Sequence, residues 1–152
     1  AEEALGASDD PLIMVGSEHI HAGIVGIVAS RLADHRHRPA IVYQRGPDVS
    51  RASARSIPAF DVIDAIRKEK DLLERHGGHR AAAGFTVRNE NLDLLRDRLI
   101  NTAAERLDEH ELTRVFDIDA QVRLGDLNGT EIKGLMRFEP CGQGNRKPRS
   151  FF

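Results

Sequence analysis

The sequence predicts an α/β domain, a mixed β-sheet flanked by helices, with an extension at its C-terminal end. Short apolar runs typical of strands alternate with longer segments whose apolar residues recur at helical spacing. The chain has 152 residues, 40% hydrophobic and 30% charged, which suffices for one domain with its own core. We expect a linker over residues 1–11, the domain over 12–112 and the extension over 113–152.

The first part of the chain predicts a strand, a helix and a second strand. Residues 11–16 form a short apolar run typical of a buried strand. Residues 21–35 have the length and apolar spacing of a helix, with glycines where the helix could pack closely or meet a ligand. The second strand is expected over residues 39–45, which the chain enters through a proline.

A third strand is expected over residues 49–56, where small and basic residues alternate. Successive side chains of a strand point to opposite faces of the sheet. Arg51, Ser53 and Arg55 should therefore share one face. This arrangement would bring two guanidinium groups and a hydroxyl side by side.

The next segments continue the alternation of helices and strands. Residues 60–76 predict a helix that ends just before a glycine, and residues 81–87 a returning strand. Residues 89–110 predict a long helix whose first residue, an asparagine, would cap it. Apolar residues alternate over 115–124, which predicts a half-buried strand.

The last segment differs from the rest of the chain. A short helix over residues 130–138 is followed by a loop rich in glycine and proline. The sequence then stops on two phenylalanines, so we expect the natural chain to continue beyond them.

Composition limits the classes of function. The single cysteine, Cys141, excludes an intramolecular disulfide, and we expect a cytoplasmic protein. No apolar stretch is long enough to span a membrane, and the acidic first residues do not form a signal peptide. Although the net charge is only −2, arginines dominate residues 19–56 and acids dominate 89–131. The basic part is typical of a local phosphate or nucleic-acid site, although solvated surface arginines would give the same pattern.

Two histidine pairs raise the question of a metal site. His19 and His21 lie two residues apart, as do His35 and His37. Neither pair is accompanied by a carboxylate or cysteine at a recognisable ligand spacing. Because Cys141 also lacks activating neighbours, we expect neither a bound metal nor a self-contained catalytic centre within this chain.

Phosphate-binding features are the chemistry that remains. Glycine amides and helix N-termini attract anions, and arginine adds a charged fork of donors. The candidate substrate- and phosphate-binding residues are His21, Gly23, Ser53, Arg55, Ser56, Gly77, Gly78, His79 and Arg80. The alternative interpretation is that Gly77 and Gly78 only make a tight turn, which His79 caps.

Four segments together resemble the RecJ single-strand-specific DNA exonucleases in order and spacing. They are HIHAGIVGIVASRL (19–32), SRASARSIPAFD (50–61), LLERHGGHRAAAGF (72–85) and FEPCGQGN (138–145). The first three resemble the DHH-associated domain of the DHH phosphoesterase superfamily. The fourth resembles the RecJ junction that leads into an oligonucleotide-binding fold.

The resemblance implies roles for individual residues. Ser53 and Arg55 match the serine and arginine that in this family hold the 5′ phosphate of the strand. Gly77, Gly78 and His79 match the glycine-glycine-histidine block that faces the metal centre. By this resemblance His79 has a supporting role in catalysis.

The sequence also departs from the family pattern. His21 matches the histidine of a Trp-His-Pro-Gly block, but Ile20 and Ala22 replace the tryptophan and the proline. Ala52 stands where glycine is usual, and Cys141 replaces a phenylalanine. The first three departures leave the polar groups of the motifs in place.

The resemblance implies the substrate-binding part of a 5′-to-3′ single-stranded DNA exonuclease of DNA repair and recombination. Its partners would be single-stranded DNA with a 5′ phosphate and the DHH and oligonucleotide-binding domains of the same chain. Two divalent metal ions, manganese or magnesium, would be held by the DHH domain, so this part alone is expected to be inactive. The alternatives are the related domains of oligoribonucleases and cyclic-dinucleotide phosphodiesterases, and a non-catalytic RNA-binding module of the alanyl-tRNA synthetase type.

Overall fold

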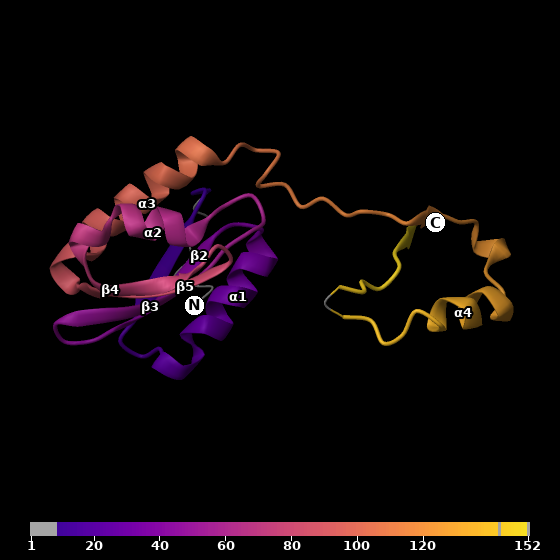
Figure 1. Cartoon of the computed structure of the whole chain (residues 1–152), viewed down its shortest axis with the longest axis horizontal. Helices are drawn as coiled ribbons and strands as arrows, with labels where there is room; N and C mark the ends of the chain where they lie inside the picture. The colour runs from indigo at the N-terminus through magenta and orange to yellow at the C-terminus, as the bar shows by residue number, and fades with distance from the viewer. Residues whose placement is uncertain (1–8, 143, 152) are drawn as a thin grey trace. The chain divides into compact units, whose positions relative to one another are not determined.

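The computed structural model describes residues 9–142 and 144–151, so most of the linker predicted over residues 1–11 lies outside the described residues. The chain divides into two compact units, Ala1–Arg114 and Val115–Phe152. The first unit is a β-sheet with helices on both faces (Figure 1). None of the helices in the described residues is long and apolar enough to cross a membrane.

A five-stranded mixed sheet forms the middle of the first unit, as the sequence predicts. Its strands are β1 (Ile13–Ser17), β2 (Ala40–Arg45), β3 (Val49–Arg55), β4 (Leu73–His79) and β5 (Ala82–Arg88). They lie in the order β1-β2-β3-β5-β4. β1 pairs with β2 in parallel, and the other pairs are antiparallel.

Helices cover the two faces of this sheet unequally. α1 (Val25–Arg36) follows a 3-10 turn at Ala22–Ile24 and lies on one face, whereas α2 (Val62–Lys68) and α3 (Leu92–Arg106) lie on the other (Figure 1). The α1 side has a small apolar cluster made of Ile13, Val25, Ala29, Leu32, Ala33, Ala40 and Val42. The α2–α3 side has the larger core, centred on fully buried residues such as Phe60, Ile66, Leu95 and Leu99.

The helix predicted over residues 60–76 is wrong in its second half. α2 ends at Lys68, a 3-10 turn follows at Lys70–Leu72, and the chain then becomes β4. Leu72 and Leu73 continue the apolar spacing of a helix, but Leu73 pairs with Val87 of β5 instead. Pairing with a distant strand therefore overrides the local pattern.

Asn89 does not cap the long helix. It begins a 3-10 turn, and α3 starts at Leu92 with no side-chain cap. The carboxamide of Asn89 donates to the carbonyl oxygens of Gly46 (2.8 Å) and Pro47 (3.0 Å) and accepts from Ser50 Oγ (2.7 Å). Asn89 thus ties the β2–β3 turn to the end of β5.

The second unit is small and largely exposed. It contains β6 (Ala120–Gln121) paired in parallel with β7 (Ser150–Phe151), and α4 (Gly129–Met136), which confirms the short helix predicted nearby. The strand predicted over 115–124 is wrong except for its two residues in β6. Its alternating apolar residues, such as the 48% exposed Ile118, find no sheet to cover them among the described residues of this unit.

Candidate nucleic-acid-binding face

Cross-strand pairing brings predicted site residues into rows. Residues paired between neighbouring strands point to the same face of a sheet. Val42, Ser53, Gly84 and Gly77 are successive partners across β2, β3, β5 and β4, and we call them the Ser53 row. In the same way Ala40, Arg55, Ala82 and His79 form the Arg55 row.

Both rows begin beneath α1 and continue beyond it. Val42 and Ala40 belong to the apolar cluster under α1 and are fully buried. The other members are half-buried or exposed, with Gly77 and His79 the most open. We call this uncovered part of the α1 side the open face; its residues are Ser53, Arg55, Gly77, His79, Ala82 and Gly84.

Ser53 and Arg55 form a joined pair on the open face. Nη1 of Arg55 donates to Ser53 Oγ at 3.0 Å and to the carbonyl oxygen of Ala54 at 2.8 Å. No carboxylate of the described residues lies within ion-pair distance of Arg55. The guanidinium, permanently charged and with five N–H donors, therefore keeps donors available to an anion.

The first turn of α1 approaches this pair through a glycine. A Cβ atom on Gly26 would lie 3.2 Å from Arg55 Nη2 and 3.3 Å from Ser53 Oγ. The lack of a side chain at Gly26 leaves room for the pair. Sequence reasoning did not single out Gly26; its signal was a glycine inside a segment of helical spacing.

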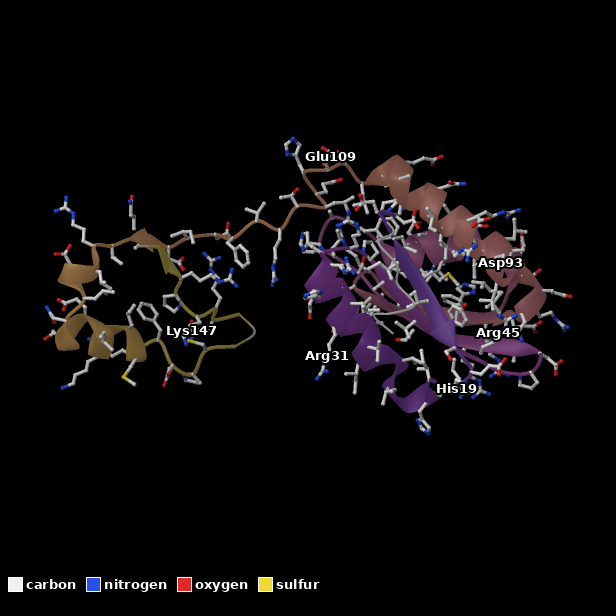
Figure 2. All side chains as sticks on the ribbon, turned by 180° about the vertical axis from the view of Figure 1, so that it is seen from behind. His19, Arg31, Arg45, Asp93, Glu109 and Lys147 are labelled. Atoms are coloured by element: carbon white, nitrogen blue, oxygen red, sulfur yellow. The ribbon has the colours of Figure 1, made fainter. Side chains whose placement is uncertain are left out.

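A shallow hollow adjoins the pair at this end of α1. It is lined by Gly23, Gly26, Ile27, Ser30, Arg31 and Arg55. Arg31 is exposed and points outward from α1 (Figure 2). The hollow thus has two arginines and no carboxylate among its lining residues, which favours an anionic ligand.

His21 and Gly23 lie at the start of the turn that precedes α1. Nδ1 of His21 accepts a hydrogen bond from the backbone N–H of Gly23 at 3.1 Å. Since Nδ1 is an acceptor, the neutral ring carries its proton on Nε2, which can donate outward. Because Gly23 lines the hollow, this hydrogen bond holds His21 at its edge.

The Gly-Gly-His segment, which the sequence leaves between the helix predicted over 60–76 and the strand predicted over 81–87, belongs to a strand. Gly77, Gly78 and His79 end β4, and a two-residue turn at Arg80 and Ala81 leads into β5. Nδ1 of His79 accepts from the backbone N–H of Ala81 at 3.3 Å, as the turn-capping alternative expected. The tight turn is made by Arg80 and Ala81 and not by Gly77 and Gly78, which belong to β4.

The two glycines of this segment differ in what the fold requires. Gly78 has φ +144°, and a Cβ there would collide with the carbonyl oxygen of Ala82 and with Ala83. The hairpin thus needs a glycine at this position. Gly77 has no atom within 4 Å of an added Cβ, so the fold leaves open space above it.

Ser56 and Arg80 have structural partners away from both rows. Ser56 Oγ donates to the carbonyl oxygen of Phe60 at 2.8 Å. Nη2 of Arg80 donates to the carbonyl oxygen of Pro58 at 2.8 Å, and its own carbonyl accepts from Val62 N–H at 3.2 Å. Both residues hold the segment that leads into α2, and their phosphate-binding role stays a prediction.

The described residues do not fit a resident metal ion. Nowhere in residues 9–142 and 144–151 do three or more His, Cys, Asp or Glu side chains gather as a ligand group. The pairs His19/His21 and His35/His37 thus remain without further ligands within this part of the chain.

The FEPCGQGN segment is organised by Asn145. Its carboxamide donates to the carbonyl oxygens of Phe138 (2.8 Å) and Pro140 (3.0 Å). Nearby, Arg146 bridges Asp117 and Asp119 at 2.9 Å each. The backbone N–H of Arg149 donates to Asp119 and is the main cause that lowers the pKa of that carboxyl. These contacts of Asn145, Arg146 and Arg149 are local to the second unit, and none of them involves a predicted site residue.

Comparison with known proteins agrees with the fold and with the motifs. The DHHA1 domain model matches residues 9–105. The single-stranded-DNA-specific exonuclease RecJ of Bacillus subtilis (strain 168) is 34% identical over 142 residues, covering 92% of this chain and 18% of the relative. Crystal structures of RecJ from Thermus thermophilus with Mg²⁺ and with Mn²⁺ both align with TM-score 0.83 at 28% identity. They cover 96% and 97% of this chain and 23% and 22% of theirs.

The chain therefore belongs to the DHHA1 domain family. The relatives that it matches over most of its length are RecJ exonucleases, which confirms the predicted resemblance and the predicted α/β class. It spans about a fifth of the length of these relatives.

Proposed function

We propose that this chain is the part of a single-stranded-DNA-specific exonuclease that binds the 5′ end of the strand. The observation that carries the proposal is the Ser53–Arg55 pair, joined at 3.0 Å on the open face. A terminal phosphate has two negative charges near neutral pH and three acceptor oxygens, which suit a guanidinium, a hydroxyl and nearby helix N–H groups. The matches to RecJ exonucleases support this substrate class.

In this proposal the open face guides the strand from its end toward the edge of the sheet. The Ser53 and Arg55 rows lead from the phosphate-binding pair to Gly77 and His79 on β4, an edge strand. Two strand spacings, about 10 Å, separate Ser53 from Gly77 and Arg55 from His79. His79 would lie beside the scissile region and donate a hydrogen bond from Nε2, because its Nδ1 is already an acceptor.

The metal centre of the proposed enzyme would belong to a DHH domain and not to the residues described above. Bound manganese or magnesium would supply Lewis-acid stabilisation and an activated water. The part played by this chain is binding: Ser53 and Arg55, with the exposed backbone of Gly77 and Gly84 in the Ser53 row, fix the strand so that the scissile bond meets that centre. An isolated chain should therefore bind strands without cutting them. The same proposal assigns the enzyme to DNA repair and recombination in the cytoplasm.

Fluorescence anisotropy tests the proposal. A labelled single strand with a 5′ phosphate is titrated with the chain and compared with the same strand bearing a 5′ hydroxyl. We expect tighter binding of the phosphorylated strand, and loss of that difference in Arg55→Ala and Ser53→Ala. Arg45→Ala serves as a control, because Arg45 is exposed at the end of β2 (Figure 2) and the register places it on the face opposite to that of Ser53 and Arg55.

Two outcomes would contradict the proposal. Equal binding of both strands would show that Ser53 and Arg55 do not select a 5′ end. Tighter binding of the corresponding RNA strand, indifferent to its 5′ phosphate, would favour the RNA-binding module instead.

A further inference from the structure

We propose that Arg51 and Arg75 bind phosphates along the second side of the Ser53 row, so that the strand lies over bare glycine backbone between these two arginines and Arg55. This inference rests on the proposed function, because it assumes a single strand on the open face. It adds two binding residues and the path of the strand.

Register places these two arginines on the same face as the Ser53–Arg55 pair. Gln44, Arg51, Thr86 and Arg75 are successive partners across β2, β3, β5 and β4, and we call them the Arg51 row. Residues two apart along a strand share a face and lie about 7 Å apart. The Ser53 row is thus flanked by the Arg51 row on one side and the Arg55 row on the other.

Both arginines are free of carboxylate partners among the described residues. Neither Arg51 nor Arg75 takes part in an ion pair with any residue that the structure describes, and both side chains are exposed. The acid next to Arg75, Glu74, is occupied: its Oε1 lies 2.7 Å from Nε of Arg88 and raises the pKa of that arginine. The neighbouring acid therefore neutralises Arg88 and leaves Arg75 available.

The floor between the cations consists of glycines that the fold does not require. Neither Gly84 nor Gly77 has a positive φ. A Cβ on Gly84 would meet only the carbonyl oxygen of Ala52 at 3.4 Å, an ordinary contact, and one on Gly77 would meet nothing. Glycine inside a strand weakens it, and one common reason for its presence is the close approach of a ligand to the backbone.

The chemistry of the rows indicates the part of the ligand that is bound. The polar residues of the three rows are three arginines, one serine, one threonine, one glutamine and one histidine, and the rows contain no Phe, Tyr or Trp. Bases usually stack on aromatic rings, whereas phosphates bind arginine forks. The open face should therefore hold the sugar-phosphate backbone and read no sequence.

The test measures how the affinity of the chain for a labelled single strand depends on salt. Each phosphate contact on a single strand contributes about 0.7 to the slope of log affinity against log salt. We therefore expect Arg51→Gln/Arg75→Gln to reduce that slope by about 1.4. The preference for a 5′ phosphate, which depends on Ser53 and Arg55, should remain.

A matched variant controls for net charge. Arg45→Gln/Arg67→Gln removes two exposed arginines on the α2–α3 side for which no ion pair is found in the described part of the chain. Its slope should stay near that of the unchanged chain. Gly84→Ala should weaken binding of strands of any sequence while leaving the unfolding temperature unchanged or raised, because its added Cβ fits the fold.

The outcomes separate this inference from the proposed function. Equal slopes for the two double variants, with the 5′-phosphate preference intact, would overturn the inference and leave the proposed function standing. A reduced slope only in Arg51→Gln/Arg75→Gln supports it. If the unchanged chain binds both strand ends equally, the proposed function fails, and if it binds no strand at all, both fail.

Discussion

The two faces of the sheet differ in how far helices cover them. On the α2–α3 side, inward residues of β3 and β5 such as Ala54, Phe85 and Val87 are buried under two helices. On the α1 side, one helix covers only the first residue of the Ser53 and Arg55 rows, Val42 and Ala40, and leaves Ser53, Arg55 and the glycines of β4 and β5 uncovered. One face thus supplies the stability of the domain, which allows the other to keep bare backbone and arginines for which the described residues provide no carboxylate partner.

The largest effect should come from substitution on the covered face. Phe85 is 4% exposed, and Phe85→Ala should lower the free energy of unfolding by about 3–5 kcal/mol, because it leaves a cavity in the larger core. Its neighbour Thr86 belongs to the Arg51 row on the opposite side of the sheet and is only half-buried, so Thr86→Ala should change that free energy by less than about 0.5 kcal/mol. Urea unfolding measures both. Similar losses for the two variants would break the comparison.

The adjacent glycines of β4, Gly77 and Gly78, test whether the fold or a ligand requires bare backbone on that strand. Gly78→Ala should destabilise the domain by about 1–3 kcal/mol, because φ +144° and the collision with Ala82 strain any side chain there. Gly77→Ala should be neutral or stabilise by up to about 1 kcal/mol, since nothing lies near its Cβ. Thermal unfolding of the two variants provides the measurement. A destabilised Gly77→Ala would mean that the fold, and not a ligand, requires that glycine.

A smaller effect on stability, with a clear effect on binding, is expected at Gly26. Alanine favours a helix over glycine by up to about 1 kcal/mol, which offsets the tight approach of its Cβ to Arg55 and Ser53. Gly26→Ala should therefore leave the unfolding temperature nearly unchanged and reduce the preference for a 5′-phosphorylated strand. The anisotropy assay measures that preference. If the variant keeps the full preference, the Ser53–Arg55 pair does not need the space that Gly26 leaves free.

The smallest effect concerns the second unit and its response to pH. The pKa of Asp119 in the folded chain is lowered from 3.8, chiefly by the hydrogen bond from Arg149. Its contribution to stability is therefore present above the unfolded value and is lost as the pH falls through the folded one. The carboxyl resonance of Asp119, followed by NMR, should titrate with a midpoint below 3.8. A midpoint at or above 3.8 would contradict the hydrogen-bonded geometry, and Asp119→Asn identifies the resonance.

Sequence alone predicted what depends on neighbours along the chain. The alternation over residues 49–56 correctly assigned Ser53 and Arg55 to one face, because strand periodicity is local. The sequence predicted close packing at the glycines of residues 21–35, but the residues that Gly26 and Gly84 approach could not be predicted, since each depends on how a helix or strand distant in sequence lies against β3. The helix predicted over 60–76 was wrong at Leu73 for a related reason. The spacing of Leu73 suits a helix, and only its pairing with Val87, which is distant in sequence, makes it part of a strand.

The measurement that tests the central claim most directly is NMR mapping of backbone amides during titration with a 5′-phosphorylated single strand. We predict that shifts concentrate on β3 around Ser53 and Arg55, on the first turn of α1, and on β4 and β5 around Gly77 and Gly84. Amides of α2 and α3, which cover the opposite face, should stay unchanged. Shifts that concentrate on α2 and α3, or that are identical for a 5′-hydroxyl strand, would contradict the account.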